Sequence, residues 1–557
     1  MMNGALSDAS GALRDEYSTV VVGSGYGGSI TAARLAEAGH SVCVLERGKE
    51  WQVGDFPDRL RELAGNVRSK RNPLGLIDYY LCKDIDVLKG SGLGGTSLIN
   101  LNVAFRPDPE FFDSDIWPKA YRDLAESGAI WDSYAKAEQM LRANPHPDLG
   151  ARTKYQMLGK RAEQLQDAKF GPVNLTVNFD VDGRNHVGVE QKPCINCNDC
   201  FPGCNVGAKN TLYMNYLPWA KQKGAEIFTQ IDVRGIAQQD SGVYVVYYRH
   251  NRAKGHGEVR QIRAKNVVLS AGAVGSTEIL LRSAGEHGLT ASNRLGHGFS
   301  GNGDYIGLVY NTDHRTNVMG YGNRPDSKRA SVQPGTTITG AIQYDRSRPF
   351  GDRITIEDFT VVPSALVDTY RHTLPALAHF GDDMDSGDWA SEVKRIARDQ
   401  VRWDPEGALN HSMVYLVMAV DDAQGVLSLN DKDKVDIHWP SVRTDPIFET
   451  IDQELHEHAR TLGGTYRQLD RVNPFADGHK GNLITAHALG GCCVADDADG
   501  GVVDADGRVF DDAGGVHDGL YVVDGAIVPG SIAVNPFLTI SALAERISEQ
   551  MPATLRG

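Results

Sequence analysis

What the 557-residue sequence lacks excludes several classes of protein. It contains no run of about 18 apolar residues, so we expect no membrane-spanning helix. The first 18 residues hold no basic segment followed by an apolar one, which argues against a secretory signal and predicts a cytoplasmic protein. Cations are outnumbered, 57 against 72 anions with a net charge of −15, which argues against a nucleic-acid surface.

Only eight cysteines occur, and four of them stand within eleven residues. In a cytoplasmic protein such a cluster indicates a metal site rather than a disulfide framework. The apolar and charged fractions, 41% and 23%, are ordinary for a globular protein. Because single cores rarely exceed about 250 to 300 residues, the length predicts two or more domains or one domain with large insertions.

The chain is organised around residues 18–48, STVVVGSGYGGSITAARLAEAGHSVCVLERG. A strand from Thr19 feeds Gly23-x-Gly25-x-x-Gly28, then an alanine-rich helix and a second strand that ends at Glu46. The three glycines allow a sharp turn, a close approach to pyrophosphate and tight packing of helix on strand, and the acid can bind a ribose diol. This pattern predicts a dinucleotide site; it favours a ribose without 2′-phosphate but does not separate FAD from NAD.

The rest of the chain suggests a dinucleotide fold split by insertions. A glycine-rich loop lies at 88–106, and a strand, glycine turn and helix recur at 266–284. Period-two segments between 305 and 445 predict an antiparallel sheet, which a helix at 446–469 should cross. We assign this region to a substrate domain.

The clustered cysteines are Cys194, Cys197, Cys200 and Cys204. Their C-x2-C-x2-C-x3-C spacing is the one bacterial ferredoxins use for [4Fe–4S] clusters, although Asn205 stands where a proline would follow and no second run exists. Four thiolates could also bind zinc, or the thiols could simply be reduced. We favour the cluster and leave zinc and free thiols open.

Four stretches together resemble one family, the FAD-dependent glucose-methanol-choline (GMC) oxidoreductases, and within it the cholesterol-oxidase-like branch. They are VVVGSGYGGSITAARLAEAGHSVCVLERG, GSGLGGTSLINLNV, LSAGAVGSTEILLRSA with the later GHGFSGNGD, and HALGG with GLYVVDGAIVPGSIAVNPFLTISALAER. The resemblance spans both ends of the chain in order. It implies an α/β fold with a Rossmann-like FAD-binding domain and an antiparallel-sheet substrate domain.

The resemblance also implies roles for individual residues. Gly23, Gly25 and Gly28 would hold the pyrophosphate of FAD and Glu46 its adenosine ribose. Other expected FAD contacts lie near the isoalloxazine, the adenine, the ribityl chain and the pyrimidine end: Gly94, Gly95, Asn100, Val233, Asp524, Gly525 and Phe537.

His487 and Asn535 fall where the family places its catalytic pair. Oxidation of an alcohol needs a base for the hydroxyl proton beside flavin N5, and imidazole titrates near neutrality. His517 lacks such a context and is expected on a surface loop. No carboxylate precedes the predicted strand 414–419, where isomerising steroid oxidases carry a glutamate, so we favour simple dehydrogenation; placing Glu357 over the flavin is only a guess.

We therefore expect oxidation of a secondary alcohol on a bulky apolar or sterol-like framework, with O2 or an external electron acceptor. A primary aliphatic or aryl alcohol dehydrogenase, a flavin-dependent hydroxynitrile lyase and an iron–sulfur electron carrier or sensor stay open. The predicted FAD-binding domain comprises 14–50, 85–106, 210–304 and 482–557. The predicted substrate domain comprises 51–84, 107–209 and 305–481, with the cysteine loop at 192–209.

Overall fold

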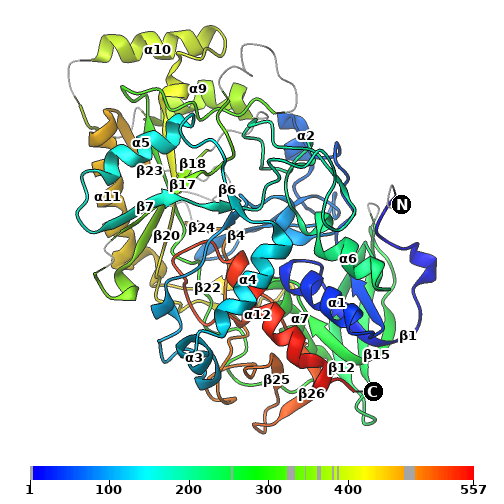
Figure 1. Cartoon of the computed structure of the whole chain (residues 1–557). Coiled ribbons are helices and arrows are strands. Elements are labelled where there is room, and N and C mark those ends of the chain that lie inside the picture. The colour runs from blue at the N-terminus through cyan, green and yellow to red at the C-terminus, as the bar shows by residue number, and fades with distance from the viewer. Residues whose placement is uncertain are drawn as a thin grey trace.

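The computed structural model describes residues 4–252, 255–322, 333–344, 347–360, 366–378, 382–385, 388–468 and 483–556. The fold is mixed α/β and contains one mostly parallel sheet and one antiparallel sheet, as the sequence predicts (Figure 1). No helix in the described part of the chain has the length and apolar character needed to cross a bilayer.

The first sheet is built on β1 (Glu16–Val22), which pairs in parallel with β2 (Val42–Leu45) and β15 (Arg260–Leu269). Two further parallel strands extend it: β11 (Glu226–Phe228) beside β2 and β26 (Val516–Val522) beside β15. The antiparallel strands of this sheet are β12 (Ile231–Gln238), β13 (Tyr244–Arg252), β14 (Gly255–His256) and β25 (Arg508–Phe510). β11 and β12 are separate strands, because Gln230 takes a left-handed conformation between them.

Helices from both ends of the chain pack together beside this sheet. The N-terminal α1 (Tyr26–Glu37) contacts the C-terminal α12 (Phe537–Gln550), which in turn contacts α4 (Ile130–Leu141) (Figure 1). Small residues on α1, such as Ala32 and Ala33, are fully buried and allow this close packing. The first and last segments of the sequence therefore share one core.

The second sheet has the strand order β19-β23-β16-β20-β18-β17-β7 and is antiparallel throughout. Its strands are β7 (Ala168–Pro172), β16 (Tyr305–Tyr310), β17 (Gly340–Tyr344), β18 (Ile354–Phe359), β19 (Asp382–Asp383), β20 (Met413–Ala419) and β23 (Thr465–Gln468). The crossing helix α11 (Pro446–Leu462) buries Ile451 and Leu455 against it and ends before Gly463, at φ 60°, rather than at 469.

The prediction that 426–430 and 435–439 join this sheet is wrong. β21 (Val426–Leu429) and β22 (Val435–His438) form a separate hairpin. Leu427 and Ile437 of this hairpin pack on Phe299 and Trp439 in a different hydrophobic cluster, which removes them from the large sheet.

A small sheet joins the two regions. β24 (Leu483–Thr485) runs parallel to β4 (Ile85–Gly90), which pairs with β3 (Ile77–Tyr80). Since β4 and β24 run parallel, the segments after them leave this sheet in the same direction. The segment with His487, after β24, therefore runs beside the glycine-rich loop after Gly90. Two distant parts of the sequence are thereby placed side by side.

The remaining elements are α2 (Leu60–Gly65), β5 (Val103–Ala104), α3 (Lys119–Glu126), β6 (Asn144–Pro145), α5 (Thr153–Ala162), β8 (Asn174–Leu175), β9 (Gly183–Arg184), β10 (Glu190–Gln191), α6 (Tyr216–Gln222), α7 (Ala273–His287), α9 (Val367–Ala378) and α10 (Trp389–Val401). Tyr121 of α3 and Tyr134 of α4 lie in the core of the first sheet, whereas β7 is an edge strand of the second. The domain division at 107–209 stays a prediction, and the boundary at 481/482 lies outside the described residues.

Candidate functional site

A pocket of about 800 Å³ opens where the parallel strands of the first sheet end. The turn after β1, the end of β2, the loop 89–96, β12 and the start of α7 all contribute to its wall. Ligands of open α/β sheets bind at this carboxyl edge. Of the predicted cofactor contacts, the following line the pocket: Gly23, Gly25, Glu46, Gly95 and Val233.

The three glycines of the motif are required for different reasons. A Cβ at Gly23, which has φ 97°, would lie 2.2 Å from the carbonyl oxygen of Ser270, and one at Gly28 would lie 2.1 Å from that of Gly23. A Cβ at Gly25 would meet nothing within 4 Å. Packing of the chain therefore explains Gly23 and Gly28 but not the glycine at position 25, which borders the pocket.

Glu46 is nearly buried at the pocket wall. It accepts hydrogen bonds from Ser24, whose backbone N lies at 3.2 Å and Oγ at 2.5 Å, and from the backbone N of Gly48 at 2.8 Å. The same Ser24 Oγ accepts a hydrogen bond from Gly94 N at 3.0 Å. Glu46 thus fixes the β1 turn against the second glycine-rich loop while it faces the pocket.

Other predicted cofactor residues support the wall without lining this pocket. Asn100 Nδ2 donates to the hydroxyl of Tyr26 at 2.8 Å, and the Tyr26 ring stacks on Phe537 at 4.8 Å. Asp524 accepts hydrogen bonds from Gly272 N at 2.8 Å and Ser276 Oγ at 2.5 Å, which joins it to the start of α7. Gly28, Gly94 and Gly525 are likewise outside the lining, so their contacts with a cofactor stay predictions.

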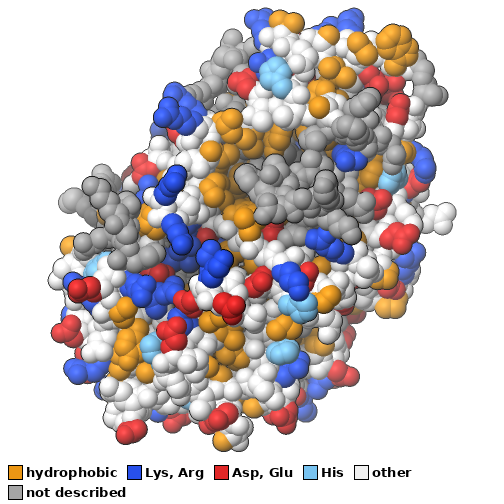
Figure 2. All heavy atoms as spheres, turned by 180° about the vertical axis from the view of Figure 1, so that it is seen from behind, with side chains coloured by type: hydrophobic (Ala, Val, Ile, Leu, Met, Phe, Trp, Pro, Cys, Tyr) orange, Lys and Arg blue, Asp and Glu red, His pale blue; other side chains and the backbone are white. Residues whose placement is uncertain are grey.

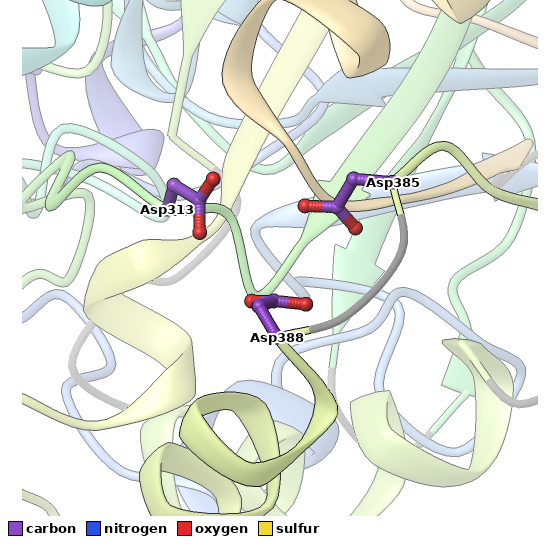
Figure 3. A group of neighbouring side chains, drawn as sticks. All are labelled: Asp313, Asp385 and Asp388. Atoms are coloured by element: carbon purple, nitrogen blue, oxygen red, sulfur yellow. The ribbon is translucent and has the colours of Figure 1, made fainter.

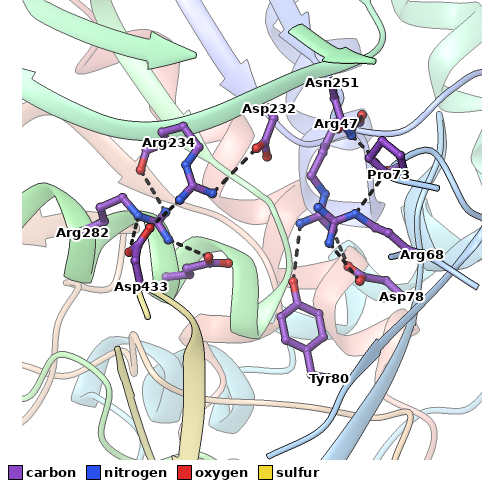
Figure 4. A network of polar contacts seen from close by, with 11 residues as sticks. Arg47, Arg68, Pro73, Asp78, Tyr80, Asp232, Arg234, Asn251, Arg282 and Asp433 are labelled. Atoms are coloured by element: carbon purple, nitrogen blue, oxygen red, sulfur yellow. Dashed lines mark hydrogen bonds and ion pairs between the residues drawn. The ribbon is translucent and has the colours of Figure 1, made fainter. Parts of the chain in front are cut away.

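The sequence reasoning missed a group of cations around the pocket (Figure 4). Arg47 and Arg68 both pair with Asp78, the second at 3.2 Å. Although burial alone would raise it, these guanidiniums hold the pKa of Asp78 at about 2.

On the opposite side of the pocket, Arg234 and Arg282 pair with Asp433 at 2.7 and 2.9 Å (Figure 4). Lys89 also lines the wall. Arg234 and Arg282 also pair with Asp232 at 3.7 Å and Glu278 at 2.7 Å, so a diphosphate would share these cations with carboxylates. The sequence spacing of these arginines does not indicate that they lie together, because their partner Asp433 comes from the distant β21–β22 turn.

The predicted base His487 is held by a buried carboxylate. Its Nδ1 lies 2.6 Å from Oδ1 of Asp304, and the side chains of the two residues are 15% and 4% exposed. The second oxygen of Asp304 accepts from Thr485 Oγ1 at 3.0 Å and Ala486 N at 2.9 Å. Asp304 therefore fixes the imidazole through Nδ1 and leaves Nε2 for a ligand.

Asn535 lies at the end of a segment that Asn302 holds in place. The Asn302 side chain accepts from the backbone N of Ile532 at 2.9 Å and donates to the carbonyl of Val534 at 2.9 Å. Asn535 Nδ2 is 3.4 Å from Oε2 of Glu357. Within the described residues, Asn535 Oδ1 and Glu357 Oε1 have no hydrogen-bond partner although both are buried.

No carboxylate directly precedes β20, as the sequence indicates, but Glu357 of the neighbouring strand lies beside Asn535. It belongs to β18 and pairs with Leu416 of β20, the neighbouring strand, rather than preceding β20 in the sequence. Complete burial raises its pKa well above the usual value, and the nearby carboxylates of Asp358 and Asp304 add to the rise. The pairs His487–Asp304 and Asn535–Glu357 are therefore electrostatically connected.

The expectation for His517 is wrong. This residue lies in β26 and is 7% exposed. Its ring nitrogens contact Gln238 Oε1 at 3.1 Å and the carbonyl of Thr290 at 2.8 Å. It is a satisfied structural histidine rather than a surface residue.

All four clustered cysteines line one separate cavity of about 330 Å³. The chain turns around this cavity through left-handed residues at Asn196 (φ 59°), Asn198 (φ 54°) and Gly203 (φ 130°). Asparagine and glycine tolerate this conformation at low cost, so the loop can wrap a compact group.

Unsatisfied polar groups surround the same cavity. Asn102 lines it and is fully buried, yet neither atom of its amide has a partner in the described chain, and the same holds for Oδ1 of Asn198. Lys209 also lines it, and its Nζ contacts only the carbonyl oxygens of Leu98 at 3.1 Å, Asn100 at 2.5 Å and Cys200 at 3.3 Å among these residues. Buried amides and cations normally have partners, which suggests that a polar, anionic group belongs in this cavity.

A group of three carboxylates lies elsewhere, near β19 and the start of α10 (Figure 3). Single oxygen atoms of Asp313, Asp385 and Asp388 all lie within 4.8 Å of one another. Partial burial and the neighbouring acids raise the pKa of Asp385 to about 6, and Arg395 pairs with Asp388 at 3.4 Å. Partly exposed acidic groups of this kind are common without an ion, and we assign it no ligand.

Comparisons with known proteins agree with this geometry. The family models of GMC oxidoreductases match residues 20–300 and 421–544. Cholesterol oxidases of Mycobacterium tuberculosis and Acinetobacter baumannii are each 26% identical to the chain over 97% of its length and 92% and 95% of theirs. A long-chain-alcohol oxidase of Arabidopsis thaliana is 23% identical over 99% of this chain and 69% of its own.

Among solved structures, pyridoxine 4-oxidase from Mesorbium loti superimposes with a TM-score of 0.62 at 16% identity, over 96% of this chain and 99% of that one. This similarity supports the fold. The family models, which cover more than half of the sequence, show that the chain belongs to the GMC oxidoreductases, the FAD-dependent alcohol oxidases and dehydrogenases.

Proposed function

We propose that this protein oxidises a secondary alcohol on a bulky, apolar framework of the sterol type to the ketone. The observation that carries the proposal is the pairing of His487 with buried Asp304 next to the Asn535–Glu357 pair. Bound FAD supplies the acceptor for the hydride that leaves the alcohol carbon. The chain itself must bind the alcohol and handle its proton.

His487 takes the hydroxyl proton at Nε2, because Asp304 occupies Nδ1 and stabilises the imidazolium that results. The free oxygen of the Asn535 amide faces a site without a protein partner and can orient the substrate. Next to it, the neutral form of Glu357, which its burial favours, can donate a hydrogen bond to the substrate oxygen. Glu357 therefore holds the hydroxyl oxygen while His487 removes the single hydroxyl proton.

An apolar framework suits the surroundings of Asn535. Its Nδ2 contacts the sulfur of Met418 at 3.9 Å. Met418 belongs to a hydrophobic cluster with Leu416, Ile338 and Val177, against which Phe359 and Phe105 pack. The names of the cholesterol and long-chain-alcohol oxidases among the relatives agree with a large apolar substrate.

Anaerobic mixing with a panel of alcohols tests this proposal. We expect sterols and other bulky secondary alcohols to bleach the flavin absorbance faster than short primary or aryl alcohols. Bleaching by any alcohol excludes a hydroxynitrile lyase with a purely structural flavin. Absence of bleaching by the entire panel would contradict the proposed activity.

The pocket at the carboxyl edge of the first sheet fits the adenosine diphosphate part of FAD. Gly25 would leave space for the pyrophosphate, Glu46 would accept hydrogen bonds from the ribose, Val233 would lie near the adenine, and the surrounding arginines would compensate negative charge. The Asn100, Phe537 and Gly525 region would hold the flavin end.

Replacing Gly25 with valine tests this assignment. The new side chain meets no protein atom within 4 Å of its Cβ, so the fold should persist while the flavin content falls at least about tenfold. Gly11→Val, also in open space, is the control and should keep its flavin. The measurement is the flavin-to-protein absorbance ratio together with circular dichroism, and a folded Gly25→Val variant with full flavin would contradict the assignment.

Glu357 allows a test by pH. Its folded-state pKa is raised, so the folded protein disfavours the charged form and loses stability as the pH rises above the unfolded value near 4.5. Glu357→Gln removes this cost. We expect its melting temperature at pH 8 to exceed that of the wild type by about 1–3 °C, with the difference vanishing towards pH 4. An equal difference at both pH values would contradict the assignment of a neutral Glu357.

The four-cysteine cavity is proposed to hold a [4Fe–4S] cluster that passes electrons to an external acceptor. In the described chain, the four thiols are not among the sets of three or more ligand atoms that lie within 4.8 Å of one another. Zinc would need its sulfurs about 3.8 Å apart, given Zn–S bonds of about 2.3 Å. Wider spacing, the unsatisfied amide of Asn102, and the buried Lys209, whose contacts are carbonyl oxygens, favour a larger anionic cluster.

The position of the four-cysteine cavity indicates the electron acceptor. Lys209 contacts Cys200 on one side and the carbonyl of Asn100, in the proposed flavin loop, on the other. A cluster would therefore lie one side chain from that loop, close enough to take electrons singly. Reduction of a dye such as ferricyanide should then be faster than O2 consumption; without a cluster, O2 is the acceptor.

A further inference from the structure

The outer surface of α10 carries two parallel rows of exposed side chains. One row is apolar, with Trp389, Val393, Ala397 and Val401 at intervals of four residues. Trp389, Val393 and Val401 are 70%, 51% and 84% exposed. At intervals of four, the side chains of a helix form one continuous ridge, here about 18 Å long.

The second row is basic and consists of Lys394 and Arg398, with Arg402 directly after the end of the helix, and all three are exposed. None of the three forms an ion pair within the described residues, and Arg398 donates only to the carbonyl of Glu406, at 3.4 Å. A free row of cations is unusual on a chain with a net charge of −15.

The opposite side of α10 holds the helix in place. Arg395 donates to Asn311 Oδ1 at 2.6 Å, and buried Asp399 accepts from the backbone N of Leu409 at 2.8 Å. Ile396 packs on the hydrophobic cluster that contains Leu308 and Trp403. These contacts therefore fix the helix with both exposed rows on its outer side.

Figure 1 places α10 at one extremity of the molecule, beyond α9 and the seven-stranded sheet. In Figure 2, which shows the molecule from behind, hydrophobic and basic side chains lie together on this end. A projecting helix can meet a flat surface along its full length without obstruction.

We propose that α10 docks the protein on an anionic lipid surface. The apolar row, with tryptophan at one end, would enter the boundary between headgroups and acyl chains, and the basic row beside it would meet anionic headgroups. This arrangement fits a bilayer better than a second copy of this chain, because a lipid surface offers apolar and anionic groups in two adjacent layers along the whole ridge.

Flotation with vesicles tests the proposal. The full-length protein should bind vesicles of phosphatidylcholine with phosphatidylserine and bind phosphatidylcholine alone far more weakly. Lys394→Gln/Arg398→Gln/Arg402→Gln should weaken binding to the anionic vesicles roughly a hundredfold, because each surface cation contributes about fivefold. Trp389→Ser/Val401→Ser should weaken binding to both kinds of vesicle.

Matched controls separate this from a general change of charge or fold. Lys169→Gln/Lys223→Gln/Lys432→Gln removes three exposed cations elsewhere and should bind like the wild type. All variants should keep their flavin content and melting temperature. Wild-type protein that ignores anionic vesicles overturns the proposal, as do α10 variants that bind undiminished. A wild-type dimer that Trp389→Ser/Val401→Ser dissociates, without vesicle binding, would identify a second copy as the partner instead.

Discussion

Replacing His487 with alanine is expected to lower kcat for alcohol oxidation by about 10² to 10⁴, the range that general bases contribute. The imidazole is the group whose free Nε2 can take the hydroxyl proton, since Asp304 holds Nδ1 at 2.6 Å. Flavin content and melting temperature should change little, because His487 lies outside the lining of the dinucleotide pocket. Stopped-flow flavin reduction under anaerobic conditions measures the reductive step directly.

The control is His438→Gln, because this histidine is 56% exposed and belongs to the separate β21–β22 hairpin. It should reduce its flavin at the wild-type rate. If His487→Ala also did so, within about twofold, the protein would either use another base, with Glu357 the first candidate, or serve as an electron carrier whose alcohol site is not used.

The dinucleotide fold could be predicted because its determinants are local. The turn at Gly23 and the strand that ends at Glu46 lie within one short segment, and Gly23 and Gly28 are each required by close backbone packing that the sequence spacing expresses. The antiparallel sheet was equally predictable from its alternation. The hairpin at 426–438 was misassigned because alternation shows that a strand has one buried face, not which core covers it.

Residues of the candidate site could be predicted only where they belong to a sequence motif. The positions of Asp304 and Glu357 at the site could not be predicted, because they arise from strand pairing. β18 lies beside β20, and the start of β16 lies beside the end of β24. The place of Asn102 and Lys209 at the cysteine cavity could not be predicted either, since an unsatisfied amide or a buried cation is recognised only once burial is known. Long-range contacts of this kind leave no periodic signal in a sequence.

Replacing Cys197 with serine is expected to abolish incorporation of iron and acid-labile sulfide. Cys197 is buried while the other three are partly exposed, so water has the least access to a metal ligand lost at this position. Cys82→Ser, a buried cysteine far outside the loop in sequence and away from the cavity lining, is the control and should retain both. Zinc in place of iron in the wild-type protein would decide against a cluster, and no metal at all would leave reduced thiols.

Lys209 gives the sharper test of what the cavity holds. A cluster that gains an electron gains negative charge, so removing a buried cation beside it must make reduction less favourable. We expect Lys209→Met to lower the midpoint potential of the cluster by about 60 mV or more, which corresponds to about 1.4 kcal/mol for one electron, while Lys209→Arg keeps it near the wild-type value. Lys221→Met, a partly exposed lysine paired with Asp8, should leave it unchanged. Spectroscopic redox titration measures the cluster and the flavin in one experiment, and an iron-loaded Lys209→Met variant with the wild-type potential would show that the carbonyl oxygens of Leu98, Asn100 and Cys200 are the only groups this lysine serves.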